Sequence, residues 1–531
     1  MTRSKLKGVF AFFSAACAVG IGAAAVAQGR GIPVVRTDRG LVRGATAADV
    51  DYFKGIPYAL PPVGLLRWRA PQQVPAWSGI RDATAFGHDC VQLPAPGQAE
   101  QAGPGMSEDC LYLNLWRPAG VRRGRRLPVM VWIHGGAYIN GSASLSLYDG
   151  SALARQGVIL VSINYRLGRL GFFAHPALTA ANADSGALGN YALMDQIAAL
   201  RWVQANVAGF GGDPANVTIF GQSAGGLSVA TLMASPMATG LFARAIVMSG
   251  GARYGAKGPV SVARAERTGQ ALARQFGVDG DDAKALDQLR SIPAERLAQS
   301  TSFAALFAPL PDGSMPAWGP VIDGHVLTGY FEDAMRAGAV ARVSFMAGAT
   351  TNDAAAPAEG DPFARFGPDA DRARSLYATD PADAPRAIAV EGGMVEPTRL
   401  TVDLMQRQGI PAYFYRAGYV PAGKASAWVK GVPHGGEIAL VFDNLAALDN
   451  PSNPVSAADR AASAQMSRYF VNFAKTGNPN DAGLPDWPAY EATRKSVMEF
   501  RQAGPVGGPD PLRARLDLLE AAADRATPST H

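Results

Sequence analysis

The sequence predicts an α/β fold in which a large, mostly parallel central sheet is flanked by helices. Short apolar runs, such as Leu127 to Ile133, alternate with segments of helical period, of which Tyr191 to Val207 is the clearest. A continuous apolar run is typical of a strand buried on both faces, because helices cover both sides of a parallel sheet. The chain has 531 residues, 48% hydrophobic and 18% charged, which allows a large core and argues against disorder over most of its length.

The predicted elements divide the chain into a sheet region and two insertions. Apolar residues recur at helical spacing at positions 193, 194, 197, 200 and 203. Six apolar runs are the expected strands: Leu127–Ile133, Val158–Asn164, Val217–Phe220, Ala245–Met248, Val343–Ala347 and Ala412–Arg416. Segments 252–311 and 361–397 are helical and polar without clear strands, which predicts helical cap insertions over the sheet. Further helices are expected at 457–475 and 511–526, whereas residues 36–117 are short and turn-rich.

Residues 1–27 have the pattern of a signal peptide. Three basic residues precede an apolar stretch from Val9 to Val26, and the stretch ends at a small-x-small cleavage site, Ala25 to Ala27. We therefore expect one mature domain over residues 28–531, secreted or periplasmic, with no stable membrane span after cleavage. The alternatives are an uncleaved anchor, disfavoured by the Ala and Gly content, and acylation at Cys17, disfavoured by Ser14 where a large aliphatic residue is needed.

Loss of that segment changes the charge and the cysteine count. Removing its three basic residues takes the formal net charge from +5 to +2, which leaves no basic footprint for nucleic acid. Cys90 and Cys110 remain, and an even pair in an exported chain predicts a disulfide, with two unlinked buried thiols as the alternative. The bridge would close a loop of about 20 residues and stabilise the fold by roughly 3 kcal/mol.

A candidate nucleophile stands in the sequence GQSAG, Gly221 to Gly225. The motif follows the predicted strand 217–220 and precedes Leu227 to Ala230, which can begin a helix. Only in that strand–turn–helix setting does the pattern have a mechanical meaning, because the sharp turn exposes the serine and needs glycine on both sides. We therefore expect Ser223 to be the nucleophile; an inert serine in a glycine-rich turn is the alternative.

A candidate oxyanion hole follows the strand at 127–133. The sequence His134-Gly135-Gly136 lets the backbone approach a reacting carbonyl closely. N–H groups aimed at the developing negative charge contribute roughly 3 kcal/mol each. The expected donors are Gly135, Gly136 and Ala224, the residue after the nucleophile. An ordinary turn at the end of a strand is the alternative, and His134 is expected to shape this loop and not to transfer protons.

The candidate base is found by elimination. The chain has six histidines: His88, His134, His175, His325, His434 and His531. In hydrolases with this turn the chain order is serine, acid, histidine, which excludes the three that precede Ser223. His531 is terminal, and His325 leaves little chain for the acid. His434 remains, in the loop GVPHGGE, where a catalytic imidazole is typically found.

The candidate acid lies between Ser223 and His434, in a loop directly after a strand. Asp353 in GATTND follows the predicted strand 343–347 and fits this requirement. It would orient the imidazole and stabilise its charged form. Glu359 and Asp361 come later and are less well placed, and a turn-forming aspartate is the alternative reading of Asp353.

Four stretches resemble the type-B carboxylesterase family, which includes cholinesterases and bacterial p-nitrobenzyl esterases. They are 53–71 (FKGIPYALPPVGLLRWRAP), 107–116 (SEDCLYLNLW), 189–226 (GNYALMDQIAALRWVQANVAGFGGDPANVTIFGQSAGG), and the C-terminal pair 473–480 (FAKTGNPN) and 487–490 (WPAY). The match extends over nearly the whole mature chain, and the motifs are long and specific.

The resemblance implies an α/β-hydrolase fold and a serine–glutamate–histidine triad. Carried over to this sequence, the nucleophile falls on Ser223, the base on His434 and the acid on Asp353. The chain departs from the family at the acid, where Glu is usual; Asp is one methylene shorter, so the loop or the imidazole must shift by about 1.5 Å to keep the hydrogen bond. Gln222 stands where eukaryotic members have Glu, which removes a negative charge beside the nucleophile and disfavours a cationic, choline-like substrate.

The expected function is hydrolysis of carboxylic esters of small molecules through an acyl-enzyme. Two alternatives stay open: a non-catalytic binding or adhesion protein on the same scaffold, and hydrolysis of an amide, carbamate or lactone by the same groups. No cofactor and no metal are expected, because the sequence shows neither a nucleotide-binding loop nor a cluster of metal ligands.

Overall fold

The computed structural model describes residues 1, 32–93, 102–251, 253, 259–302, 304–305, 308–309, 315–354, 359–449 and 454–526. The chain divides into two units, Met1–Gly31 and Ile32–His531, and the fold belongs to the second. Apart from Met1, the predicted signal peptide at 1–27 lies outside the described residues, so it stays a prediction.

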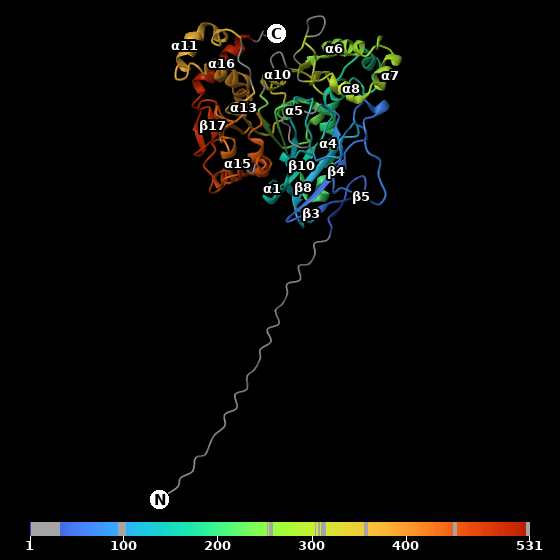
Figure 1. Ribbon diagram of the computed structural model, residues 1–531, viewed down its shortest axis with the longest axis horizontal. Coiled ribbons are helices and arrows are strands. Elements are labelled where there is room, and N and C mark those ends of the chain that lie inside the picture. Colours follow the sequence, from blue (N-terminus) through green and yellow to red (C-terminus); the bar gives the residue numbers. More distant parts are fainter. Residues whose placement is uncertain are drawn as a thin grey trace. The chain divides into compact units, whose positions relative to one another are not determined.

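A sheet of 11 strands forms the centre of the second unit (Figure 1). In spatial order its strands are β18 (Gly504–Pro509), β17 (Ser496–Arg501), β16 (Ala412–Ala417), β15 (Ser344–Thr350), β12 (Arg244–Met248), β11 (Gly212–Gln222), β9 (Leu127–Ile133), β10 (Ile159–Ile163), β8 (Tyr112–Pro118), β4 (Val50–Pro57) and β3 (Ala45–Ala47). Neighbours from β10 to β17 pair in parallel, and antiparallel strands stand at both edges. The predicted, mostly parallel sheet is confirmed.

Short strands of the described residues form separate small sheets: β1 (Val34–Arg36), β2 (Leu41–Arg43) and β5 (Ile80–Asp82) in one, β6 (Asp89–Cys90) and β7 (Met106–Ser107) in another, and β13 (Val260–Ser261) and β14 (Val321–Ile322) in a third. The helices that precede residue 300 are α1 (Ser151–Arg155), α2 (Gly168–Gly171), α3 (Pro176–Ala181), α4 (Tyr191–Asn206), α5 (Ala224–Ala234), α6 (Val262–Gln275), α7 (Ala283–Ser291) and α8 (Ala294–Gln299). Those that follow are α10 (Phe331–Arg336), α11 (Ala370–Leu376), α12 (Ala384–Val390), α13 (Glu396–Arg407), α14 (Ile438–Val441), α15 (Ala457–Thr476) and α16 (Arg513–Ala526).

The two predicted insertions are helical. Residues 252–311 supply α6, α7 and α8, which lie together at the upper right of Figure 1, and residues 361–397 supply α11, α12 and the start of α13. The helices expected at 457–475 and 511–526 appear as α15 and α16. Within the described ranges, no helix combines the length and the apolar character that crossing a membrane requires.

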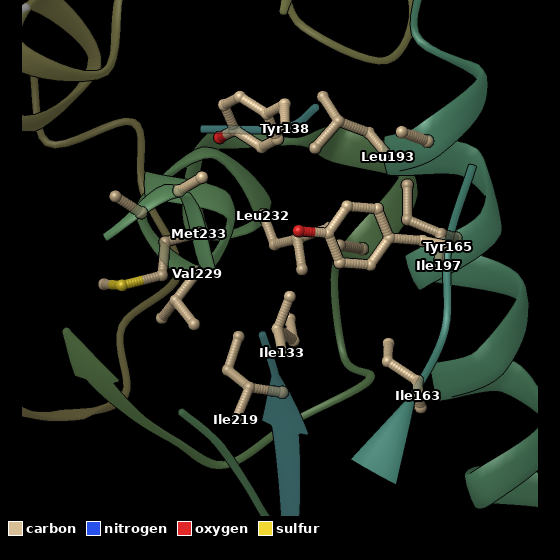
Figure 2. Packing of buried hydrophobic residues seen from close by; sticks show 14 of the residues in the cluster. Ile133, Tyr138, Ile163, Tyr165, Leu193, Ile197, Ile219, Val229, Leu232 and Met233 are labelled. Carbon is tan, nitrogen blue, oxygen red and sulfur yellow. The ribbon is translucent and has the colours of Figure 1, made fainter. Parts of the chain in front are cut away.

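Alternate residues of β9 enter two separate hydrophobic clusters. Val129, Val131 and Ile133 belong to one, whereas Met130 and Trp132 belong to the other. Figure 2 shows the first cluster, in which three neighbouring strands meet α4 and α5 through the residues Ile133, Ile163, Ile219, Leu193, Ile197, Val229 and Leu232. The second cluster contains residues of α14 and α15. Helices therefore cover both faces of the sheet, as the continuous apolar runs predict.

The antiparallel edge formed by β4 and β8 is not anticipated by the apolar pattern. Both strands carry buried polar residues, which interrupt the run that would mark a strand. Asn114 accepts a hydrogen bond from the Gly55 N–H at 2.9 Å, and Arg117 forms an ion pair with Asp51 at 3.1 Å. Because these partners lie on different strands, their pairing becomes visible only once the strands are side by side.

The predicted disulfide between Cys90 and Cys110 is confirmed, with the two Cα atoms 5.0 Å apart. Both residues are buried, and Cys110 lies two residues before β8. We expect replacement of both cysteines by serine to lower the free energy of unfolding by about 3 kcal/mol, because the unfolded chain regains the entropy of an open loop. Urea unfolding with and without a thiol reductant measures this. The prediction is contradicted if the urea midpoint of the wild type stays unchanged when the disulfide is fully reduced.

Candidate active site

Ser223 occupies the turn between β11, which ends at Gln222, and α5, which begins at Ala224. Its backbone has φ 58° and ψ −125°, a conformation that non-glycine residues rarely adopt. The Ser223 N–H donates to the Met248 carbonyl at 2.9 Å, which ties the turn to β12. Glycine is required at 225, because a Cβ there would lie 2.0 Å from the carbonyl oxygen of Ile133. The sharp turn that the GQSAG sequence predicts is present.

The candidate oxyanion loop lies directly against this turn. A Cβ on Gly135 would stand 2.6 Å from the Gln222 carbonyl oxygen and 3.2 Å from the Ser223 Cβ. Gly136 has φ 108°, which favours glycine, and its carbonyl accepts from the Asn140 N–H at 3.0 Å. Gly135 therefore stands beside the turn that carries Ser223, and Gly136 packs against Asn140 within its own loop.

His134 is buried within this loop. Its Nδ1 lies 2.9 Å from the Gly135 carbonyl oxygen, and its own carbonyl accepts from the Tyr165 hydroxyl at 2.7 Å. Burial lowers the pKa of His134 to about 4, so the ring is neutral at physiological pH. These contacts support a role in shaping the loop.

The structure brings His434 and Asp353 into hydrogen-bonding contact, His434 Nδ1 to Asp353 Oδ1. The two residues come from loops that are 81 positions apart in the chain. The loops are joined by their backbones: the Asn352 N–H donates to the Val432 carbonyl at 2.9 Å, and Asn352 forms a bridge with Pro433. The shorter aspartate therefore reaches the imidazole at the position where the resembling family has glutamate.

The Asp353 carboxylate is enclosed by donors. Its side chain is 0% exposed, and Oδ2 accepts from the Ser249 hydroxyl at 2.6 Å and from the Thr350 N–H at 2.9 Å. Burial alone would raise the pKa of Asp353, but the hydrogen bonds from His434, Ser249 and Thr350 hold it below its ordinary value. Burial likewise opposes the charged form of His434, and contact with Asp353 raises the pKa of His434 above its ordinary value. The carboxylate is thus kept ionised beside the imidazole.

The second ring nitrogen of His434 faces the turn. His434 Nε2 lies 3.2 Å from the side-chain Nε2 of Gln222, the residue directly before Ser223. Since Nδ1 faces the carboxylate, Nε2 carries the lone pair in the neutral ring and accepts a hydrogen bond from the Gln222 amide. The imidazole is therefore oriented with its basic nitrogen toward the segment that carries the serine.

Glu437 is a buried acid that the sequence analysis did not identify. It lies three residues after His434, is 0% exposed, and neither of its carboxyl oxygens has a hydrogen-bond partner among the described residues. Burial, followed by the charge of Asp353, raises the pKa of Glu437 to about 8. In the loop GVPHGGE it looks like an ordinary exposed glutamate, and no local pattern marks it as buried.

Replacing Glu437 by glutamine should change how stability depends on pH. Its folded-state pKa of about 8 is above the ordinary value of 4.5, so the wild type loses stability between these pH values as the unfolded state releases the proton first. We expect Glu437→Gln and wild type to be about equally stable near pH 4.5, and the variant to be more stable at pH 8 by on the order of 4 kcal/mol. Urea unfolding across this range measures it, with the exposed Glu491→Gln as control. A difference independent of pH would contradict it.

The second insertion contacts both loops of the candidate site. Arg386, on α12, donates to the Asn352 side-chain oxygen at 2.7 Å and forms an ion pair with Asp383. Lys430, four residues before His434, pairs with the same Asp383 carboxylate at 3.0 Å. The hydrogen bond from Arg386, with that from Lys430, holds the pKa of Asp383 far below its usual range. Arg386 and Asp383 together thus connect the loop of Asp353 to the loop of His434.

Comparison with known proteins identifies the same family that the motifs resemble. The sequence profile of the carboxylesterase family matches residues 32–375 and 386–508. The fumonisin B1 esterase of Sphingopyxis macrogoltabida is 36% identical over 499 residues, covering 88% of this chain and 86% of that protein. The para-nitrobenzyl esterase of Bacillus subtilis is 35% identical over 503 residues, covering 88% of this chain and 94% of that protein.

Solved structures agree with the sequence matches. A structure of PNB esterase superimposes with a TM-score of 0.76 at 32% identity, and the alignment covers 92% of this chain and 100% of that one. The likeness therefore extends over most of this chain and supports the α/β-hydrolase fold.

Proposed function

This chain belongs to the carboxylesterase family, and from that membership we propose that it hydrolyses carboxylic esters with Ser223 as nucleophile, His434 as general base and Asp353 as the supporting acid. The family supplies the ester hydrolase class, and the site residues are the part we propose. The observation that carries the proposal is the contact of His434 with Asp353 through Nδ1, while Nε2 faces the turn that holds Ser223.

In the proposed mechanism, His434 Nε2 takes the proton of the Ser223 hydroxyl as the oxygen attacks the ester carbonyl. The carbonyl oxygen becomes negatively charged, and the N–H groups of Gly135, Gly136 and Ala224 stabilise it. The protonated His434 then donates its proton to the leaving alcohol oxygen, which leaves an acyl group on Ser223. Water, activated by the same imidazole, releases the acid and restores the serine.

Asp353 keeps the imidazole in the tautomer that this mechanism needs. A carboxylate facing Nδ1 accepts the ring N–H, so the lone pair stands on Nε2. It also stabilises the imidazolium, which is consistent with the raised pKa of His434. The Ser249 hydroxyl and the Thr350 N–H hold the Asp353 carboxylate in place, and the carboxylate in turn orients the His434 ring.

The test combines turnover with covalent labelling. Purified mature protein should hydrolyse p-nitrophenyl acetate, butyrate and octanoate, and a fluorophosphonate probe should add to Ser223, as located by peptide mass spectrometry. Absence of turnover on every ester together with absence of labelling would favour a binding protein on this scaffold. Labelling of Ser223 together with turnover of an amide or carbamate, but of no ester, would keep the proposed site residues and change the proposed bond from an ester to that amide or carbamate.

Uncharged esters are the proposed substrate class, because Gln222 contributes no charge beside His434. The relatives' names, fumonisin B1 esterase and para-nitrobenzyl esterase, support an ester as the substrate. Burial keeps Glu437 protonated at neutral pH, since its pKa is about 8, so it adds no negative charge either.

The variant Gln222→Glu should shift the preference toward cationic esters. A carboxylate beside His434 Nε2 stabilises the imidazolium, so the acidic limb of kcat/KM against pH should move up by about one unit. The ratio of kcat/KM for a choline ester to that for its uncharged dimethylbutyl isostere should rise about 10-fold. Both measurements use the same substrate pair on wild type and variant. An unchanged ratio at an unchanged pH profile would show that position 222 does not set the charge of the site.

A further inference from the structure

The segment next to the Cys90–Cys110 disulfide holds the loop that carries the candidate oxyanion donors. Gln92 lies two residues after Cys90 and is 4% exposed. Its side-chain Nε2 donates to the Gly141 carbonyl at 2.8 Å, and the Gly141 N–H donates to Gln92 Oε1 at 2.8 Å. One amide side chain therefore satisfies both main-chain polar groups of a residue 49 positions away, as a neighbouring strand would.

Gly141 is in close contact with the start of the donor loop. It has φ 116°, and a Cβ at this position would lie 2.4 Å from His134 Nδ1 and 2.6 Å from the Gly135 carbonyl oxygen. The turn between them is tight as well, since a Cβ on Gly136 would lie 2.0 Å from the Asn140 carbonyl oxygen. Because packing at this density transmits displacements, a shift of Gly141 would move Gly135 and Gly136.

A second residue of the same segment holds the chain just beyond Gly141. Asp89 is 1% exposed, and its carboxylate accepts from the Ser142 hydroxyl and, at 2.9 Å, from the Ser144 hydroxyl. Gln92 Nε2 also donates to the Cys90 carbonyl at 3.0 Å. The disulfide joins Cys90 to Cys110, so both contacts are anchored close to the start of β8.

We propose that Gln92 is a positioning residue for the oxyanion donors, acting through Gly141, and that the Cys90–Cys110 bridge keeps it in place. This role rests on the esterase function proposed above. Donors stabilise the transition state only where the charge develops, and a misplacement of about 1 Å costs on the order of 100-fold in rate. Gln92 contacts the loop and not the reacting groups, so its loss acts on kcat and leaves substrate binding unchanged.

The test compares two substitutions of Gln92. Gln92→Met keeps the side-chain volume and removes both hydrogen bonds to Gly141 and the one to the Cys90 carbonyl, whereas Gln92→Glu keeps an acceptor for the Gly141 N–H. We expect kcat for p-nitrophenyl butyrate to fall about 10- to 100-fold in Gln92→Met and by less in Gln92→Glu, with KM within about threefold of wild type. Affinity for a trifluoromethyl ketone, whose serine adduct carries an oxyanion, should fall in proportion to kcat/KM.

Gln204→Met is the matched control, because the Gln204 amide also bonds main-chain carbonyls, those of Pro214 at 2.9 Å and Leu241 at 2.8 Å. It should lower stability and leave kcat unchanged. A folded Gln92→Met variant with kcat within twofold of wild type, or with unchanged affinity for the ketone, overturns the proposal.

A second measurement decides the matter if Gln92→Met does not fold. Wild type is treated with a dithiol, which is oxidised to its cyclic disulfide as Cys90 and Cys110 become thiols. We expect kcat to fall while far-UV circular dichroism is retained; an unchanged kcat in both the reduced protein and Gln92→Glu overturns the proposal. Wild-type protein without turnover or probe labelling would instead contradict the proposed function.

Discussion

Ser223→Ala should lower kcat for p-nitrophenyl esters by about 10⁵- to 10⁶-fold and abolish labelling by a fluorophosphonate. The substitution removes the oxygen that forms the acyl bond, and His434 then has no hydroxyl to deprotonate. What remains is water attack assisted by the donor loop, which is expected to exceed the uncatalysed rate by about 10³-fold. Steady-state hydrolysis of p-nitrophenyl butyrate and probe labelling of the same preparation measure both effects.

The matched control is Ser235→Ala. Ser235 is buried at the opposite end of α5, and its hydroxyl has no hydrogen-bond partner in the described part of the chain. It tests whether loss of a buried hydroxyl at this helix is enough to impair turnover. Retained labelling and retained turnover in Ser223→Ala would remove this serine from the mechanism and with it the proposed function.

Asp353→Asn should lower kcat by about 10⁴-fold at neutral pH. The amide introduced at 353 can donate to His434 Nδ1, and the ring would then carry its proton on Nε2, where it cannot accept one from Ser223. Two of the neighbouring donors favour this orientation, because the Ser249 hydroxyl and the Thr350 N–H both select the amide oxygen on their side, whereas the Ala354 N–H donates at 2.7 Å to the oxygen that faces His434. The pH dependence of kcat/KM measures it, since the raised pKa of His434 depends on contact with the carboxylate.

Two further substitutions separate the acid from its alternatives. Asp361→Asn changes a later candidate, an exposed residue paired with Arg374 at 2.6 Å, and should leave kcat within about twofold of wild type. Asp353→Glu restores a carboxylate, so its activity should lie well above that of Asp353→Asn, although the longer side chain is crowded in this buried site. A large loss in Asp361→Asn with full activity in Asp353→Asn would reverse the assignment.

Most of the sheet was predictable because its central strands are buried on both faces. A strand such as β9 has no polar face, so its apolar run is continuous and easily found. The antiparallel strands β4 and β8 were missed because their polar residues are buried in pairs that lie on different strands. Whether such a pair is buried depends on the fold, so the sequence of either strand alone does not reveal it.

The same limit applies to the candidate site. Ser223 was predictable because its turn needs glycines at fixed positions, which leaves a local pattern. Glu437 left none: its burial, and the pKa of about 8 that follows, depend on elements packed around it from elsewhere. Gln92 was likewise hidden, because its partner Gly141 lies in a different segment and the two meet only in the folded chain.

The position of Asp383 between Arg386 and Lys430 constrains how new selectivity could be engineered or evolve in this chain. Exchanging the 361–397 insertion for that of a relative is a direct way to change the helices of this insertion and, with them, substrate selectivity. Such a chimera would also exchange Arg386, which bonds the Asn352 side chain beside Asp353, and Asp383, which pairs with Lys430 on the loop of His434. Grafts that keep Asp383 and Arg386, or supply an equivalent carboxylate and cation, should retain the relative positions of the two loops. Grafts without them should change the insertion and also displace the loops of Asp353 and His434.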